Sequence, residues 1–316
     1  MSNDLLIIGP SLQLHGIGGV TIHVQRLRDY LEINGIKYIF KDYRTNSLLK
    51  LLKAIKKADI IHYHISNPIY QFILVLSGSL MGKKTVVTLH GNYGRFGNLK
   101  NWLVRRTIKT ATIPILINKK SYGICKQFNG NAKFISAFIP PQKEECLQKD
   151  ILDIIEKLHN EKKKIISTNA YNVSIDKSGN DIYGIDFLVQ FFKDNNDISL
   201  FVSDPSGNYH KLYSNLKSDS VFFIDYPHSY FELLKHIDYF VRNTSTDGDA
   251  LSVKEALYLG VPTLCTDVVD RPQGVRLFKY CDKVSFEKAM NSPVEEKTSI
   301  ENGAEKIIEV YKSILL

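Results

Sequence analysis

The chain has 316 residues, of which 44% are hydrophobic and 23% are charged, the composition of a soluble globular protein with about two domains. It contains no run of about 18 or more apolar residues, so no transmembrane helix is predicted. Its four cysteines form no Cys-x-x-Cys pair; we therefore expect reduced thiols, a cytoplasmic protein and no metal site.

Basic charge is concentrated in the first half of the chain. The net charge is +8, but residues 1–150 carry 22 Lys and Arg against 8 Asp and Glu, whereas residues 151–316 carry 19 against 25. We therefore expect the first half to face an anionic partner. Nucleic acid, anionic lipid and a diphosphate-bearing acceptor are the candidates, and a solvated Lys-rich surface would explain only part of the excess.

Short apolar runs alternate with amphipathic segments along the whole chain. We predict strands at 5–8, 38–40, 59–64, 85–90, 113–117, 133–139, 164–168, 198–202, 221–224, 239–241 and 261–265. We predict helices at 21–34, 48–57, 70–81, 99–109, from 121, and at 147–159, 185–193, 209–216, 230–236, 251–259 and 300–316. This alternation predicts an α/β protein with two Rossmann-like, doubly wound parallel sheets facing across a cleft. Pro140-Pro141 breaks the pattern and marks the predicted linker.

Two predicted strands of the first half end in histidines. His62 and His64 belong to the strand 59–64, where we expect them on opposite faces, and His90 ends the strand 85–90. Ligands bind outside the carboxyl ends of the strands in open α/β sheets, so His64 and His90 are candidate site residues. For His62, a hydrogen-bonded core position is an equally good interpretation.

A glycine-rich turn follows the first predicted strand, in the segment 15–21 with the sequence His-Gly-Ile-Gly-Gly-Val-Thr. Its spacing does not match the dinucleotide-binding fingerprint, and no acidic residue follows at the required distance. Gly18 and Gly19 would nevertheless let the backbone approach a ligand at a helix N-terminus.

The most informative stretch is the polar loop that precedes the helix 251–259. Asp247 lies in this loop, Asp249 or Ser252 is placed to cap the helix, and Glu255 lies within the helix, with seven residues between it and Asp247. A helix N-terminus favours anions, and carboxylates accept hydrogen bonds from sugar hydroxyls. The stretch could therefore hold a diphosphate on its amides and a polyol on each carboxylate.

This stretch resembles the donor-binding motif of retaining glycosyltransferases of family four, which have the GT-B fold. The segment 255–262, Glu-Ala-Leu-Tyr-Leu-Gly-Val-Pro, is similar to the family's Glu-Ala-Met/Leu-x-x-Gly-x-Pro, and Asp247 stands at the position of a family Glu. Residues 59–64 and 88–91 resemble the family's Asp-x-x-His-x-His and Thr-x-His-Gly. The resemblance implies that His90 lies beside the donor sugar.

The resemblance also implies a domain organisation: 1–140 as the acceptor-binding domain, 141–298 as the nucleotide-sugar-binding domain, and a final helix in 299–316 that packs back on the first domain. The chain departs from the family at two positions that supply an Arg and a Lys to the donor diphosphate. Asn169-Ala-Tyr171 and Tyr183-Gly184 stand there instead.

Three other cations could replace the missing pair. The segment Arg271-Pro-Gln-Gly274 resembles the Arg-Pro-x-Gly of enzymes that build capsule and O-antigen polysaccharides. Arg271 follows a predicted strand and could reach the donor. Lys177 and Arg276 are weaker candidates, which we expect to be solvated surface charges.

The predicted function is that of a retaining glycosyltransferase in bacterial surface polysaccharide biosynthesis. We expect a nucleotide-diphosphate sugar as the donor, with a UDP-sugar as the first candidate, and a lipid-linked polyprenyl diphosphate glycan as the acceptor. We expect no cofactor and no required metal, because Asp249 after Asp247 is better placed to cap a helix than to bind an ion. The candidate site residues are His90 and Asp247 as catalytic; Gly248, Asp249, Ala250, Leu251, Ser252, Glu255, Arg271 and Tyr226 as donor-binding; and Gly18, Gly19, His64 and Asn92 as cleft or acceptor residues.

Two other functions stay open: a sugar-nucleotide epimerase on the same fold, and a non-catalytic nucleotide-sugar or nucleic-acid binder. An epimerase would need carboxylates in the first domain, which has few, and no aromatic-basic module for single strands accompanies the basic half. Basic amphipathic helices at 48–57 and 99–109, the latter with Trp102, are typical of a protein on an anionic membrane. For 99–109 alone, a basic surface helix that packs its apolar stripe on its own core is at least as good an interpretation. We therefore expect a peripheral position on the inner face of the cytoplasmic membrane.

Overall fold

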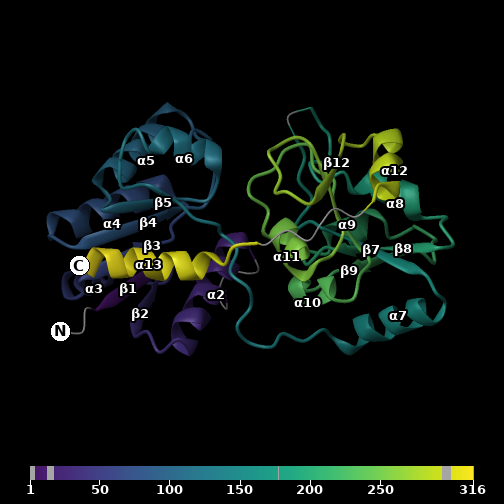
Figure 1. The fold of residues 1–316 in the computed structure, drawn as a ribbon, viewed down its shortest axis with the longest axis horizontal. Coiled ribbons are helices and arrows are strands. Elements are labelled where there is room, and N and C mark those ends of the chain that lie inside the picture. The colour runs from purple at the N-terminus through teal and green to yellow at the C-terminus, as the bar shows by residue number, and fades with distance from the viewer. Residues whose placement is uncertain (1–3, 13–17, 177, 294–299, 316) are drawn as a thin grey trace. The chain divides into compact units, whose positions relative to one another are not determined.

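Figure 1 shows the computed structural model, which describes residues 4–12, 18–176, 178–293 and 300–315. The chain divides into two compact units. The first unit consists of residues 1–143 and 301–316, and the second unit of residues 144–300. Each contains one six-stranded sheet in which all paired strands are parallel. The predicted α/β class with two doubly wound parallel sheets is confirmed.

The sheet of the first unit has the spatial order β2 (Tyr38–Asp42), β1 (Leu5–Gly9), β3 (Ile60–Tyr63), β4 (Lys84–Leu89), β5 (Ile113–Leu116) and β6 (Lys133–Phe134). The helices of this unit are α2 (Gly19–Ile33), α3 (Leu48–Lys57), α4 (Pro68–Leu80), α5 (Asn98–Thr110), α6 (Lys119–Cys125) and α13 (Gly303–Leu315). The last helix, yellow in Figure 1, thus belongs to the same unit as the first strands.

The sheet of the second unit has the spatial order β12 (Val275–Phe278), β11 (Thr263–Thr266), β10 (Tyr239–Arg242), β7 (Lys164–Asn169), β8 (Ile198–Ser203) and β9 (Val221–Ile224). Its helices are α7 (Lys149–Asn160), α8 (Ile185–Phe192), α9 (Asn208–Leu212), α10 (Tyr230–Leu234), α11 (Leu251–Leu259) and α12 (Lys283–Asn291). No helix among the residues that the structure describes is long and apolar enough to cross a bilayer.

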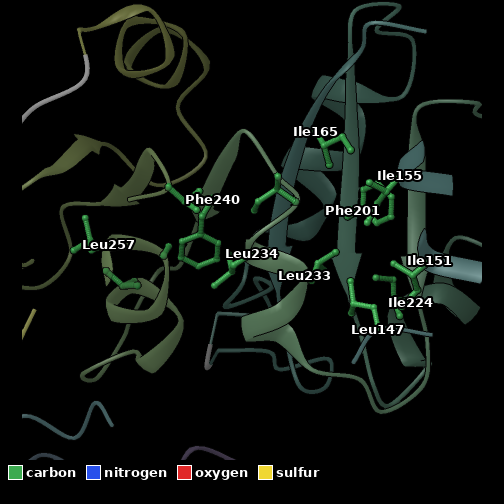
Figure 2. Packing of buried hydrophobic residues seen from close by; sticks show 14 of the residues in the cluster. Leu147, Ile151, Ile155, Ile165, Phe201, Ile224, Leu233, Leu234, Phe240 and Leu257 are labelled. Atoms are coloured by element: carbon green, nitrogen blue, oxygen red, sulfur yellow. The ribbon is translucent and has the colours of Figure 1, made fainter. Parts of the chain in front are cut away.

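Both faces of each sheet are covered, which explains why the central strands β1, β3, β4, β7, β8 and β11 are buried at nearly every position. In β1, Leu5 and Ile7 pack in one cluster with α2 and α13, whereas Leu6 and Ile8 pack in another with α3 and α4. In the second unit, Phe201 belongs to a cluster with α7, α10 and α11, shown in Figure 2. The opposite face packs against α8 and α12. This burial holds the carboxyl ends of the strands in fixed positions.

The structure corrects the predicted orientation of two histidines. His62 and His64 do not point to opposite faces: their ring centroids lie 4.0 Å apart, because residues i and i+2 of a strand share a face. His62 is fully buried, with Nδ1 2.6 Å from the Tyr311 hydroxyl of α13 and Nε2 2.8 Å from the Thr88 hydroxyl. The core interpretation of His62 is therefore confirmed.

Several predicted bounds are wrong. The strand predicted at 133–139 is shorter in the structure, where it is β6, and the helix predicted at 209–216 ends at Leu212.

The strand β12 and the helix α12 were not predicted. The Val-Arg-Leu-Phe segment of β12 is short and interrupted by a charge. In the structure that charge, Arg276, is buried and donates to the carbonyls of Ala289 and Met290 at the end of α12.

Replacing Tyr311 by Phe leaves Nδ1 of the buried His62 without the hydroxyl of α13. An unpaired buried polar atom costs about 1–3 kcal/mol, so the free energy of unfolding should fall by about that amount in urea denaturation. Tyr171→Phe, at an exposed position of the second unit, is the control and should leave stability unchanged. Equal stability of Tyr311→Phe and the unchanged chain would contradict the role of this contact.

Candidate functional site

The loop after β10 is organised around a buried carboxylate. Asp247 accepts hydrogen bonds from Nε and Nη2 of Arg242 at 3.1 and 3.2 Å, and from Nη1 of Arg271 at 2.7 Å. The side chains of Asp247, Arg242 and Arg271 are only 6%, 11% and 4% exposed. We call these three residues the Arg-Asp-Arg cluster; its two positive charges exceed its one negative charge.

The cluster lies at the carboxyl ends of three adjacent strands. Arg242 is the last residue of β10, and its Nη1 donates to the side-chain and main-chain oxygens of Asn169, the last residue of β7, at 3.2 and 3.0 Å. Arg271 donates through Nε to the carbonyl of Thr266, the last residue of β11. This is the sheet edge at which open α/β proteins bind ligands.

Arg242 was not selected as a site residue from the sequence. Its guanidinium contacts Asn169 and lies 5.0 Å from the centroid of the Tyr183 ring. Tyr183 stands at the position of the resembled family's lysine, and Asn169 directly precedes Ala170, which stands at the position of that family's arginine. A cation from the neighbouring strand β10 therefore occupies this location. The only sequence signal was an arginine at the end of an apolar strand, immediately before the loop.

The start of α11 differs from the predicted capping. Its N-cap is Ala250, and neither Asp249 nor Ser252 caps it with a side-chain hydrogen bond within the described chain. Asp249 instead forms an ion pair with Lys254 in the second turn of the helix. The first-turn amides of α11 are therefore not satisfied by an N-cap side chain.

The remaining donor-binding candidates lie around this helix start. Gly248 is exposed and donates through its N–H to Asp247 at 2.9 Å, and Ala250 and Leu251 are half-buried. Ser252 and Glu255 are buried on α11. Glu255 is close enough to Tyr230 to raise the pKa of that phenol, although burial is the larger cause.

Two candidates lie away from the Arg-Asp-Arg cluster. Tyr226 follows β9, three strands from β10, and donates to Asp150 of α7; β9 and β10 are separated by about 14 Å at ordinary strand spacing. Arg276 is bonded to α12 carbonyls, so it is not the solvated charge that was expected. Lys177 lies outside the described residues.

Histidines gather at the carboxyl edge of the first sheet. His64 follows β3 and His90 follows β4, and Nδ1 of His64 lies 2.9 Å from Nε2 of His90. His23 of α2 joins them, with its ring centroid 4.9 Å from that of His90 and 5.2 Å from that of His64. Sequence reasoning did not select His23, although it lies within the first turn or so of the helix that follows the glycine-rich turn.

The acceptor candidates occupy two loops of the first unit. Gly18 is the N-cap of α2, where its N–H donates to the Thr21 hydroxyl at 2.9 Å, and Gly19 begins the helix. Segment 13–17, the first part of the glycine-rich turn, lies outside the described residues. Asn92 accepts a hydrogen bond from Asn118 at 3.0 Å. Gly91, after His90, is approached by the guanidinium of Arg95.

The electrostatics of the two edges differ. Burial lowers the pKa of His64 and His90, and the neighbouring histidines lower both further, so both rings are neutral at pH 7. In the second unit, burial raises the pKa of Asp247, but Arg242 and Arg271 outweigh it and hold that pKa below its ordinary value. Burial raises the pKa of Asp249 despite the opposing effect of Lys254.

No family model matches the sequence, and no curated protein is similar to it by sequence search. The fold is shared with solved structures. The Anabaena protein HepE in complex with UDP has a TM-score of 0.69 at 14% identity, with 98% of this chain and 100% of that chain covered. A putative UDP-N-acetylglucosamine 2-epimerase from Listeria monocytogenes has a TM-score of 0.66 at 12% identity, over 100% and 97% of the two chains.

WaaG, a glycosyltransferase involved in lipopolysaccharide biosynthesis, has a TM-score of 0.60 at 13% identity, with 91% of this chain and 90% of that chain covered. Identities this low establish the shared fold, which is the GT-B fold of glycosyltransferases, and leave the reaction to be argued from the site.

The buried histidines make stability depend on pH. Burial lowers the pKa of His62, His64, His90 and His228 in the folded chain, whereas the unfolded chain has ordinary histidines. As the pH falls through about 6.5, the unfolded state binds more protons, so folding loses up to about 1.4 kcal/mol per pH unit for each histidine. The raised pKa of Asp249 has the opposite effect on the free energy of unfolding, but it concerns one group, whereas four histidines have a lowered pKa.

Urea unfolding between about pH 8 and about pH 5.5 measures this loss above the range in which ordinary carboxylates titrate. We expect a constant free energy of unfolding from the histidines on the alkaline side and a steady decrease below about pH 6.5. A free energy that stays level or rises across this window would show that the histidines are protonated in the folded chain.

Proposed function

We propose that the chain is a retaining glycosyltransferase that uses a nucleotide-diphosphate sugar, with a UDP-sugar as the first candidate. The observation that carries the proposal is the Arg-Asp-Arg cluster beside the N-terminus of α11. It combines buried cations with helix amides at the edge of the sheet where α/β proteins bind ligands. The proposed acceptor is a lipid-linked glycan of bacterial surface polysaccharide biosynthesis.

The donor diphosphate is proposed to bind Arg242 and Arg271 together with the first-turn amides of α11. Guanidinium groups bind phosphates through two parallel N–H donors, and the helix dipole adds to the attraction. This assignment explains how the site can work without the two cations of the resembled family. Arg242 contacts Tyr183, at the position of the family's lysine, and Asn169, which directly precedes the position of the family's arginine.

Asp247 is proposed to respond to the donor. Without a ligand it shares both arginines, which is why its pKa is low despite burial. A diphosphate with two or more negative charges competes for the same guanidinium groups. Asp247 would then turn its carboxylate toward a hydroxyl of the donor sugar, and Glu255 on α11 is proposed to accept from the ribose hydroxyls.

The chemical step is proposed as departure of the diphosphate on the same face that the acceptor attacks, with no covalent enzyme intermediate. The arginines and the helix amides stabilise the negative charge that develops on the leaving diphosphate. His90 is proposed to position the donor sugar. Its neutral ring can accept a hydrogen bond at one nitrogen and donate at the other.

Transfer is proposed to require no metal ion. Asp247 and Asp249 have the spacing of an Asp-x-Asp metal motif, but each is paired with a cation: Asp247 with two arginines and Asp249 with Lys254. Such neutralised carboxylates do not offer the anionic oxygens that Mg²⁺ or Mn²⁺ prefers. A chelator should therefore leave turnover unchanged.

An epimerase is the second candidate, because one protein of similar fold is described as a putative UDP-N-acetylglucosamine 2-epimerase. That reaction needs acid and base groups beside the sugar. In the first unit, Asp42 at the end of β2 accepts from the N–H groups of Ser11 and Arg44 at 2.8 Å each, which gives it a structural role. A non-catalytic nucleotide-sugar binder would keep the same cluster but release no product.

The membrane position is proposed from a surface of the first unit. Helix α4 packs against both α3 and α5. These helices expose large apolar side chains, notably Leu49 at 71%, Leu80 at 80% and Leu99 at 73%. Lysines lie on α3, and lysines and arginines lie on α5, on either side of the uncharged α4, as is typical of surfaces that lie on anionic lipid. We call this surface, made of α3, α4 and α5, the basic-apolar face.

Arg242→Gln tests the donor site. Losing a charged hydrogen bond costs about 1.5–3 kcal/mol, so the affinity for UDP should fall about tenfold to a hundredfold in calorimetry. Arg276→Gln is the matched control, because Arg276 is also a buried arginine of the same sheet but donates only to α12 carbonyls. It should lower stability without lowering the affinity of the folded protein. Equal UDP affinities for the two variants would remove Arg242 from the donor site.

His90→Ala tests whether His90 of the first unit acts in the transfer step without contributing to nucleotide binding. The nucleotide is proposed to bind the second unit, so its affinity should stay within about twofold while the single-turnover transfer rate falls strongly. The melting temperature of the same variant controls for a purely structural histidine. A destabilised His90→Ala with normal turnover per folded molecule would remove His90 from the reaction.

Leu80→Glu tests the basic-apolar face. Each Lys or Arg near an anionic surface contributes about 1 kcal/mol, and an added carboxylate opposes both this attraction and the insertion of the leucine. Co-sedimentation with anionic vesicles should fall for Leu80→Glu and at high salt. Val284→Glu, at an equally exposed apolar position of the second unit, should bind as the unchanged chain does. Equal binding to neutral vesicles would contradict the proposal.

A further inference from the structure

Three histidines from three different elements bring ring nitrogens together in the first unit. They are His23 of α2, His64 after β3 and His90 after β4, and one nitrogen from each lies within 4.8 Å of the others. We call them the histidine triad. Nitrogen ligands on Zn²⁺ at about 2.0–2.1 Å in tetrahedral geometry lie about 3.3 Å apart. Small rotations of the rings would therefore bring the triad to metal-binding distances.

The hydrogen bonds of the triad match those of metal-bound imidazoles. Nδ1 of His23 lies 2.7 Å from the carbonyl oxygen of Ala137. A carbonyl only accepts, so this nitrogen carries a proton, and Nε2 is the ring nitrogen through which His23 could bind a metal ion. A backbone carbonyl on the second ring nitrogen is a usual partner of a metal-bound histidine, because it fixes the tautomer and the ring orientation.

His64 has a polar atom that the reaction proposed above does not explain. The residue is completely buried, and its Nε2 has no hydrogen-bond partner among the residues that the structure describes. Its Nδ1 is 2.9 Å from Nε2 of His90. A single proton can lie between these two nitrogens. Buried polar atoms of this kind usually contact an ordered water or an ion.

The protonation state of the His64 and His90 rings favours metal binding. Burial and the neighbouring rings lower the pKa of His64 and of His90, so neither ring has to lose a proton before it binds a metal ion. The positive charge of Arg95, which also lowers the pKa of His90, opposes a bound dication. Its guanidinium is partly solvated, which weakens this repulsion.

We propose that His23, His64 and His90 bind one divalent transition-metal ion that prefers nitrogen ligands, with Zn²⁺ as the main candidate. Three imidazoles leave a fourth position for water. His90 is only partly buried, which gives an ion a route to the site. This ion is separate from the reaction: the transfer proposed above uses no metal.

Binding of the ion has a consequence that rests on the proposed function. A coordinated His90 no longer offers its ring nitrogen to the donor sugar, so micromolar Zn²⁺ should inhibit transfer and a chelator should restore it. Zn²⁺ affinity is measured without any sugar or nucleotide. If Zn²⁺ binds the triad but does not inhibit transfer, the metal site is supported and the proposed role of His90 in transfer is contradicted.

Calorimetry of the full chain with Zn²⁺ alone tests the site. We expect one equivalent to bind, and the affinity to fall at least about tenfold in His23→Gln and in His90→Gln. His159→Gln and His210→Gln are the matched controls: His159 is exposed, and His210 lies 2.7 Å from Asp225, which makes it a second place where Zn²⁺ could bind on the surface. Both controls should bind as the unchanged chain does.

Co²⁺ provides a readout that does not depend on folding of the variants. Intense visible absorption of Co²⁺ bound to the unchanged chain, with displacement by Zn²⁺, indicates a tetrahedral nitrogen site. Circular dichroism shows whether each variant is folded, and His90→Gln, at a partly exposed position, carries the test if His23→Gln fails to fold. The proposal is overturned if Zn²⁺ does not bind, if the triad variants bind as tightly as the unchanged chain, or if binding is lost in a surface control.

Discussion

The burial of Asp247 between Arg242 and Arg271 is the interaction on which the site of the second unit depends. A lone buried carboxylate would be costly, and so would either lone arginine. The three side chains therefore stabilise each other at the ends of β10 and β11, and Arg242 ties them to Asn169 at the end of β7. Because the cluster carries an excess of positive charge, we propose that a more highly charged anion can replace its internal carboxylate on the two arginines. This links the stability of the loop before α11 to occupancy of the site.

The first unit meets a different constraint, because its carboxyl edge is lined with three buried histidines and the partly buried His90. Four rings from α2, β3 and the loop after β4 lie close together, and they can do so only when most of them are neutral. His62 gains two hydroxyl partners and becomes part of the core. His23, His64 and His90 form the triad, at which we propose a metal site. The same neutrality gives the unit its expected loss of stability in acid.

Much of the fold was predictable because both sheets are covered on both faces, so that strands and helices differ clearly in their apolar pattern. Asp247 and Glu255 could be selected from their spacing around the start of α11. Arg242 could not, because its partner Asn169 lies 73 residues away in the sequence and no local pattern shows which strands are adjacent. His23 was missed for the same reason, since only the packing of α2 on the sheet brings it to His90. The faces of His62 and His64 were misassigned although strand geometry alone determines them.

Proton NMR of the full chain with a UDP-sugar, followed over time without an acceptor, tests the central claim most directly. The glycosyltransferase account predicts slow release of UDP together with a free sugar that first appears in the anomeric configuration of the donor, since the helix amides and arginines stabilise the leaving diphosphate. Conversion of the UDP-sugar into its epimer without release of UDP would contradict the account in favour of an epimerase. Binding across a panel of UDP-sugars with no chemical change would contradict it in favour of a non-catalytic binder.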